Sequence, residues 1–587
     1  MLVPFKRSKL AMLVGMAILS SSVILGGCTP GDDGVDGANG TQGLNGSQGQ
    51  QGEQGIQGVQ GDTGKDLTAE TASLKRLAAL PAGSEATGLV VSSAGDLFFN
   101  VQHPSTSNTA PFNEAAVGAI IGLNINTLSH DFEELAVPSS AVDKQNVTTA
   151  QGHYQVLLQE GDLLASSGDI VGQITTADGS AVIKQSNDPD FNAFLETKSD
   201  GTKGYLFTNW EDRPGGMSRI EIEKNALTGQ WTVGNGLMID FSAVSGTWVN
   251  CFGTMSPWGT PLTSEELYFD ETANWFDATN SNPQSLASYL GYPTDGTGEW
   301  PNPYRYGYIV EITDPTGLPT PVKVFTTGRF SHENAVVMPD NKTVYLSDDG
   351  TDVVFFKFVA DVADDLSAGT LYAAKFTQVM GAVEEKDFKF GIEWIELAHG
   401  DNTSIESWIA EYDSATVAAP SYVTDADIAA WAADKLDNGV LDTVTDERVA
   451  FLESRKAAKA LGATAEFTKM EGVNINYDAA KAGTVPYIYM AMADVKSGMS
   501  DGMGDINIPE NRCGIVYRMR LDASFNVNAM EPVVIGGPYD SSHPSNTCAT
   551  NNVASPDNVE VLSDGRILIG EDTSKHENNM VWVWKQN

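Results

Sequence analysis

Residues 333 to 349 read Glu-Asn-Ala-Val-Val-Met-Pro-Asp-Asn-Lys-Thr-Val-Tyr-Leu-Ser-Asp-Asp. Two apolar runs flank a Pro-Asp-Asn-Lys segment that is typical of a tight turn. The stretch therefore predicts two antiparallel strands joined as a hairpin. Carboxylates stand at its outer ends: Glu333 opens the first strand, and Asp348 and Asp349 close the second.

The same design recurs elsewhere in the chain. An apolar strand, a turn rich in Asp, Asn or Gly and a second apolar strand also occupy residues 88–100, 471–494 and 557–572. In the later copies a further apolar stretch follows, at 353–359, 514–521 and 581–584. Repeated small antiparallel sheets around a central channel are typical of a β-propeller. We therefore expect an all-β, propeller-like domain over residues 67–587.

The repeat also aligns carboxylates. Glu333, Glu471 and Asp557 open the first strand of their copies, and further acidic residues close the second strand. Singly, each is most simply a turn residue or a strand cap. Their recurrence at matching places predicts that they meet at the channel.

Two segments read as helical. One is a short link at residues 69–80, and the other is an insert at about residues 420–464. Within the insert, 425–435 and 447–461 have apolar residues at the 3.6-residue period of a helix. The expected domain is therefore a β-propeller with helical inserts.

The charge of the chain limits its function. It has 77 acidic against 35 basic residues, and a net charge of −42. Such a chain repels phosphate backbones, which argues against nucleic-acid binding. A solvated acidic surface explains most of this charge, and it also suits a protein that meets divalent cations.

The N-terminus reads as an export signal. Lys6, Arg7 and Lys9 precede an apolar run that ends in Leu-Gly-Gly-Cys28. This ending resembles a bacterial lipoprotein lipobox, which implies a signal peptide at 1–27 and lipidation of Cys28. A transmembrane anchor is the weaker alternative, because the run is short and ends in glycines. We expect a lipid-anchored protein of the bacterial cell envelope, at the outer membrane because Thr29 follows the cysteine.

Glycine occupies every third position from Gly31 to Gly64. This period is that of collagen, in which only glycine fits the axis of the triple helix. The segment contains no proline, the residue that normally stiffens such a helix. Residues 28–66 are thus either a stalk that joins a homotrimer or a flexible spacer, and the missing proline favours the spacer.

The four cysteines have different expected roles. With Cys28 lipidated, three remain in an oxidising compartment, so at least one is unpaired. Cys513 and Cys548 lie in loop-like sequence near the C-terminus and make a reasonable disulfide. Cys251 is left over, and it shares one short stretch of sequence with Glu265 and Glu266. A free thiol outside the cytoplasm is expected to be buried or bound to a metal.

Several motifs together resemble the PhoX-type alkaline phosphatases. The resemblance covers roughly residues 75–587, and its most specific part joins Asn250-Cys251 to Glu265-Glu266. The other motifs are Trp210-Glu-Asp-Arg-Pro-Gly-Gly-Met-Ser-Arg219, Gly328-Arg-Phe-Ser-His-Glu333, Glu471-Gly472 and Pro556-Asp-Asn558. The resemblance implies a six-bladed propeller whose channel holds iron (Fe³⁺) and calcium (Ca²⁺) ions and hydrolyses phosphate monoesters.

Site residues follow from the resemblance. It implies that Cys251 is an iron ligand, with Asp557 and Asn558 as a further ligand or supporting pair. Glu265 is a weaker candidate than Glu266, because neighbouring strand residues point to opposite faces. The resemblance also implies four further ligands of iron or calcium: Glu211, Glu266, Glu333 and Glu471. Thiolate with carboxylates suits iron, and oxygen ligands alone suit calcium.

Basic residues of the same motifs could contact substrate. Arg213 and Arg329 are candidates for holding phosphate oxygens, with a structural salt bridge as the alternative for each. His332 is expected to orient a neighbouring ligand or to satisfy a strand end rather than to act as a base. The chain departs from the family at Phe252 and Thr254, where small residues are usual, and at Lys469-Met470, where Arg-Pro is usual.

The leading hypothesis is thus a metal-dependent phosphatase acting on small phosphorylated substrates. The alternative is a non-catalytic, calcium-stabilised propeller at the cell surface, used for adhesion or matrix binding. A third hypothesis is a lactonase-like propeller hydrolase. The last two require no thiolate, so Cys251 is the residue that distinguishes them from the first.

Overall fold

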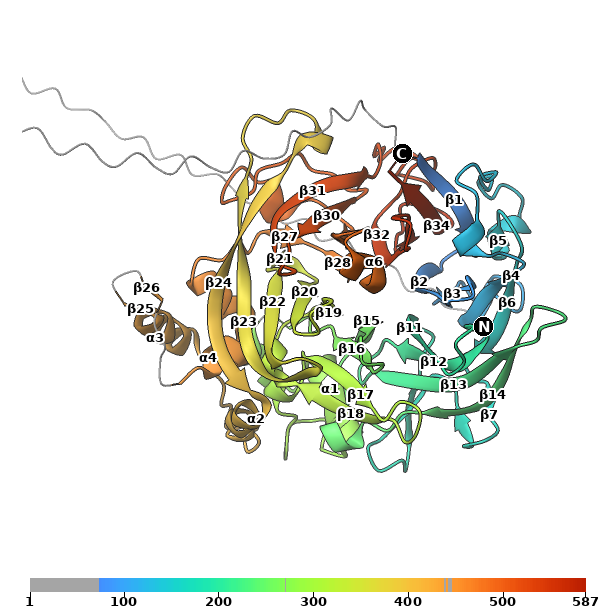
Figure 1. Cartoon of the computed structure of the whole chain (residues 1–587). Coiled ribbons are helices and arrows are strands. Elements are labelled where there is room, and N and C mark those ends of the chain that lie inside the picture. Colours follow the sequence, from blue (N-terminus) through green and yellow to red (C-terminus); the bar gives the residue numbers. More distant parts are fainter. Residues whose placement is uncertain (1–72, 270, 438–439, 442–445, 587) are drawn as a thin grey trace, which may run out of the picture. The chain divides into compact units, whose positions relative to one another are not determined.

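The computed structural model describes residues 73–586 except 270, 438–439 and 442–445 (Figure 1). The expected signal peptide, the lipidation site at Cys28 and the collagen-like segment lie outside the described residues. Among the residues that are described, no helix combines the length and the apolar character needed to cross a bilayer.

The described chain is mostly β-structure, as predicted. Three sheets are four-stranded antiparallel meanders in sequence order or nearly so. They consist of β2 (Glu85–Val91), β3 (Leu97–Gln102), β4 (Ala116–Ile121) and β6 (His153–Gln159); of β11 (Pro189–Glu196), β12 (Lys203–Trp210), β13 (Gly216–Lys224) and β14 (Trp231–Met238); and of β15 (Asn250–Met255), β16 (Pro261–Glu265), β17 (Ile309–Thr313) and β18 (Thr320–Val324).

A nine-stranded sheet follows in the chain. Its two halves meet where β24 (Phe390–Asp401) pairs with β31 (Val527–Ile535). One half runs through β19 (His332–Val337), β20 (Thr343–Asp348), β22 (Phe356–Val362) and β23 (Asp365–Gln378). The other runs through β28 (Met470–Asn474), β29 (Tyr487–Met492) and β30 (Ile515–Leu521).

The last sheet joins the two ends of the described chain. It contains β32 (Pro556–Val561), β33 (Ile567–Glu571) and β34 (Met580–Lys585), followed by β1 (Ser73–Ala79) and β5 (Thr148–Thr149). Residues 73–79 were expected to be helical, and this expectation is wrong. Pairing with the C-terminal strand β34 overrides the local helical preference, because it completes a sheet and buries the apolar side of β1.

The first strands of the sheets meet at the centre of the fold (Figure 1). They contact one another in the closed order β2, β11, β15, β19, β28 and β32, and β32 contacts β2 again. Because these strands surround one axis, residues at equivalent positions on them come close together. This arrangement positions the candidate site.

The described residues also form helices and short strand pairs. The helices are α1 (Ser281–Leu290), α2 (Asn402–Ala410), α3 (Asp425–Lys435), α4 (Arg448–Leu452), α5 (Ser454–Ala460) and α6 (Tyr477–Ala482). The short pairs are β7 (Leu163–Leu164) with β8 (Asp169–Ile170), β9 (Gln173–Thr175) with β10 (Val182–Gln185), β21 (Thr351–Val353) with β27 (Phe467–Thr468), and β25 (Leu436–Asp437) with β26 (Val440–Leu441). Helices α3, α4 and α5 fall within the insert predicted at about 420–464.

Candidate metal centre

One strand position recurs in five sheets or half-sheets. The second residue of the first strand is Asp190, Cys251, Glu333, Glu471 or Asp557. In each case the pairing with the second strand skips over this residue, so that the strand bulges there. Bulges re-aim side chains and are common beside functional sites. The repeated bulge therefore directs five potential metal ligands toward the centre of the ring.

A second row of acidic residues stands opposite. Glu211, Glu266, Asp349 and Asp572 each come directly after the last residue of a second strand. Glu266 and Asp349 are buried, and the other two are partly exposed. Their positions are equivalent because each residue directly follows the second strand of its own sheet or half-sheet.

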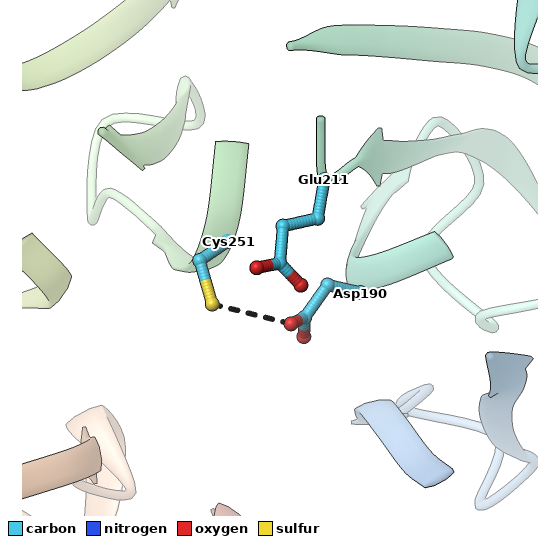
Figure 2. A group of neighbouring side chains, drawn as sticks. All are labelled: Asp190, Glu211 and Cys251. Carbon is cyan, nitrogen blue, oxygen red and sulfur yellow. Dashed lines mark hydrogen bonds between the residues drawn. The ribbon is translucent and has the colours of Figure 1, made fainter. Parts of the chain in front are cut away.

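Seven residues of the two rows form three neighbouring groups, and within each group the potential ligand atoms lie within 4.8 Å of one another. The groups are Asp190–Glu211–Cys251, Cys251–Glu266–Glu333 and Glu333–Glu471–Asp557. Cys251 and Glu333 each belong to two groups, so the three are contiguous. Figure 2 shows the first group, with side chains from three elements converging on one point.

The thiol of Cys251 lies between two carboxylates. Its Sγ atom is 3.2 Å from Asp190 Oδ2 and 3.3 Å from Glu333 Oε2 (Figure 2 shows the first contact). The remaining oxygens, Asp190 Oδ1 and Glu333 Oε1, are buried without a hydrogen-bond partner. Unpartnered buried carboxylate oxygens beside a buried thiol fit the donor set of a metal ion.

Without cations this concentration of acids is electrostatically unfavourable. Burial, with repulsion from Asp557 and Glu471, raises the pKa of Glu333 well above its ordinary value. Burial and Asp190 do the same to the pKa of the Cys251 thiol. Burial and Asp188 raise the pKa of Glu211 to about 7. Bound cations would reverse these shifts, since they favour the ionised form of each ligand.

Side chains from neighbouring strands form hydrogen bonds to the main-chain carbonyls of Asp190, Cys251 and Glu333. Asn100 donates to the carbonyl of Asp190 over 2.8 Å. The carbonyls of Cys251 and Glu333 accept in the same way from Asn209 and Ser264. These bonds join each sheet to the first strand of the next one, and they fix the backbone of each potential ligand residue.

Lys469 places a positive charge beside the acidic groups. Its Nζ lies 2.9 Å from Glu471 Oε1 and 3.1 Å from Asp349 Oδ2, and its side chain is 34% exposed. Asp349 also accepts a hydrogen bond from the hydroxyl of Tyr268. The ammonium is thus held between two carboxylates of the centre.

Some predicted residues are not brought to the centre. The carboxylate of Glu265 points away from Cys251 and is 2.8 Å from Lys323 Nζ, because alternation along the strand turns it to the face opposite Glu266. The guanidinium of Arg329 is buried against Tyr304 and donates to the carbonyls of Pro303 and Leu452. It therefore contacts protein rather than an open site.

Other predicted residues have supporting positions. Asn558 Nδ2 donates to Asp557 Oδ2 over 2.8 Å, and Asn558 Oδ1 accepts from the amide of Gly88. Arg213 is half-buried over the ring of Trp248, and its charge opposes the rise that burial causes in the pKa of Glu211. His332 Nε2 donates to Gly328 O, and burial lowers its pKa to about 3, so the ring is neutral.

The cysteines divide as the sequence suggested. Cys513 and Cys548 form a disulfide, and Cys251 is free and buried. The disulfide lies near the start of β32, since the amide of Ser555 donates to the carbonyl of Cys513. It thereby braces the strand that carries Asp557.

Four acidic residues of the centre were missed as site residues. Asp190 follows Pro189 just as Asp557 follows Pro556, and this Pro-Asp pair was the available signal. Asp349 and Asp572 were predicted among the recurring carboxylates that meet at the channel, but they were not assigned as ligands. Glu85, which opens β2, had no distinguishing motif; its Oε1 lies 2.6 Å from His103 Nε2.

Comparisons with known proteins bear on the family and the fold of the chain. A family model described as alkaline phosphatase PhoX matches residues 224–585. No curated protein matches the chain. A solved structure, Pseudomonas fluorescens PhoX in complex with vanadate, a transition state analogue, is similar at 21% identity and a TM-score of 0.51, over 73% of this chain and 83% of that one. The two share a fold.

Two further structures resemble the chain only loosely. One is a putative oxidoreductase (glucose dehydrogenase) of Thermus thermophilus, at 9% identity and a TM-score of 0.35, over 88% of this chain and 100% of that one. The other is a gluconolactonase of Xanthomonas campestris, at 10% identity and a TM-score of 0.31, over 89% and 92%.

Proposed function

The chain belongs to the PhoX alkaline phosphatase family, and on that premise we propose that it is a metal-dependent phosphatase that hydrolyses phosphate monoesters. The observation that carries the proposal is the contiguity of the three ligand groups through Cys251 and Glu333. A site for one structural calcium needs neither a thiolate nor three adjoining groups. The closed order of first strands supports counting six blades, of which the nine-stranded sheet contributes two.

The donor atoms suggest which ions bind where. The two groups that contain Cys251 suit Fe³⁺, and Glu333–Glu471–Asp557, with oxygen donors only, suits Ca²⁺. Ions held there would supply Lewis acidity that polarises phosphoryl oxygens and stabilises a leaving oxygen.

The side chains of this protein have distinct tasks around such ions. The carboxylates would hold the ions, and bound ions would in turn favour the ionised form of the carboxylates. Lys469 lies where a phosphoryl oxygen would compete with Asp349 and Glu471 for its ammonium, so it can hold substrate. Arg213, beside Glu211, can hold it from another side. Among the described residues we assign no nucleophilic serine, and none is required.

Elemental analysis and an assay on one preparation test the proposal. The purified protein is expected to contain iron and calcium and to release p-nitrophenol from p-nitrophenyl phosphate. Cys251→Ala is expected to lose iron and activity together. Glu311→Gln is the control, because Glu311 on β17 accepts hydrogen bonds from Trp258 and Thr260 and belongs to none of the three ligand groups, so the change should leave both unchanged.

The outcome also decides against the alternative. A protein that binds only calcium, keeps it in Cys251→Ala and hydrolyses none of several phosphate mono- and diesters would be an adhesive or matrix-binding propeller. The N-terminal features remain proposals as well: lipidation at Cys28, an outer-membrane location, and a collagen-like segment that serves as a spacer or joins a homotrimer. Mass spectrometry of the mature N-terminus and the mass of the protein in solution test these.

A further inference from the structure

A buried carboxylate ends the second strand in three places. These residues are Glu265 on β16, Asp348 on β20 and Glu571 on β33, and all are fully buried. Each directly precedes an acidic residue of the centre, Glu266, Asp349 or Asp572. Three sheets thus carry the same pair of adjacent acids, with the two members in different surroundings.

Each buried carboxylate has a basic partner from outside the centre. Glu265 Oε1 lies 2.8 Å from Lys323 Nζ on β18. The carboxylate of Asp348 accepts hydrogen bonds from Nε and Nη2 of Arg455 on α5, over 3.0 and 2.5 Å. Glu571 Oε2 lies 3.0 Å from His576 Nδ1. The three basic residues come from an edge strand, the helical insert and a loop. The pairing of each buried carboxylate with a basic side chain therefore does not follow from a shared local sequence.

Backbone amides complete the surroundings of all three carboxylates, and Asp348 accepts from the amide of Val354 over 3.2 Å. Glu265 also accepts from the amides of Trp248, Gly307 and Tyr308. Glu571 accepts from the amides of Ala554 and Met580 and from Trp582 Nε1. Carboxylates with this many donors have no free oxygen for a metal, which explains why Glu265 is not a ligand although Glu266 is placed as one.

Successive residues of an extended chain point to opposite sides. When the first carboxylate of a pair is held on the side away from the centre, the side chain of the next residue is directed toward the centre. The anchored carboxylate also restrains the backbone of that next residue. We propose that Lys323, Arg455 and His576 are positioning residues, each of which anchors a strand end so that Glu266, Asp349 or Asp572 faces the metal centre. The proposal rests on the proposed function for its catalytic consequence, but not for its geometry.

The pair Glu265–Lys323 gives the clearest test, because its side chains are 0% and 2% exposed and neither residue belongs to the three ligand groups. A matched control exists in Glu447–Lys435, a pair on the helical insert with 10% and 5% exposed side chains and an N–O distance of 2.6 Å. Lys323→Met and Lys435→Met therefore remove the same chemical partner at two places. The double variant Lys323→Met with Glu265→Gln avoids an unpaired buried charge and is included in case Lys323→Met does not fold.

Metal affinity is the first readout. Metal is first removed from each protein with a chelator. The protein is then titrated with calcium and with ferric iron, and the amount of bound metal is measured. If Lys323 positions Glu266, we expect about 10- to 100-fold weaker metal binding in Lys323→Met and the double variant, partial recovery in Lys323→Arg, and wild-type binding in Lys435→Met. Equal metal binding in all folded variants would overturn the proposal.

Crystal structures of the wild type and the double variant separate this inference from the proposed function. A displaced Glu266 carboxylate in the variant supports positioning even if the wild type hydrolyses no phosphate ester, in which case the proposed function alone fails. An unmoved Glu266 overturns the inference even if the wild type is an active phosphatase. Activity is measured alongside, with a fall in kcat larger than any rise in KM as the expected result.

Discussion

The Sγ atom of Cys251 lies 3.3 Å from Oε2 of Glu333, although the two residues are 82 positions apart and belong to different sheets. Both also belong to a second ligand group, so this contact joins the three groups into one centre. Removing either residue should therefore affect more than one ion.

Glu333→Gln tests this sharing. The amide keeps the size of the side chain but loses the charge that two groups need. We expect loss of more than one metal equivalent and a fall of at least about a hundredfold in kcat/KM, measured by elemental analysis and phosphate release. Glu311→Gln should resemble the wild type. Loss of a single equivalent would contradict the shared role.

Lys469 is expected to act on substrate. Lys469→Ala should lower kcat/KM by about 10- to 100-fold, since an ionic hydrogen bond to a phosphoryl oxygen is worth about 1.5–3 kcal/mol. Lys469→Arg should retain part of the activity. Lys496→Ala is the control, because Lys496 pairs with Asp494, which belongs to none of the three groups. Similar kinetics for Lys469→Ala and the control would contradict this role.

The two arginines should behave differently. Arg329→Met removes buried hydrogen bonds to Pro303 and Leu452, so it should lower the free energy of unfolding by about 1–3 kcal/mol. KM of the folded protein should not change. Arg213→Met should instead raise KM with little change in the melting temperature. Steady-state kinetics and thermal unfolding check both, and the opposite pattern would restore Arg329 as a phosphate contact.

Metal removal should make stability depend on pH. In the metal-free protein the pKa of Glu211 rises from 4.5 to about 7, chiefly through burial. The folded state therefore holds this proton more tightly than the unfolded state does. The stabilisation is full below about pH 4.5 and is lost as pH rises through 7. The apoprotein should melt at a lower temperature at about pH 8 than at about pH 5.

Calorimetry of dialysed, metal-free protein measures this effect. Glu211→Gln should reduce the difference between the two pH values, and reloading with iron and calcium should restore stability at the higher pH. An apoprotein that is more stable at the higher pH than at the lower one would show that these acids are ionised without cations.

The hairpin at residues 333–349 shows how far local sequence reaches. Strand pattern and turn chemistry are local properties, and they predicted β19 and β20 as well as the repeat. The odd number of cysteines predicted at least one free thiol, and Cys513–Cys548 was a reasonable disulfide that the structure contains. The link at 69–80 failed because β1 is a strand only through its pairing with β34, which lies at the other end of the chain.

The site divides in the same way. The resemblance of the sequence motifs to the PhoX family implied the candidate ligands Cys251, Glu211, Glu266, Glu333, Glu471 and Asp557. Only the tertiary structure decided that Asp190 joins them, that Glu265 faces Lys323 and that Arg329 is buried against Tyr304. The physical reason is that the direction of a side chain depends on bulges, on the alternation of the strand and on partners from distant sheets, none of which a linear sequence specifies.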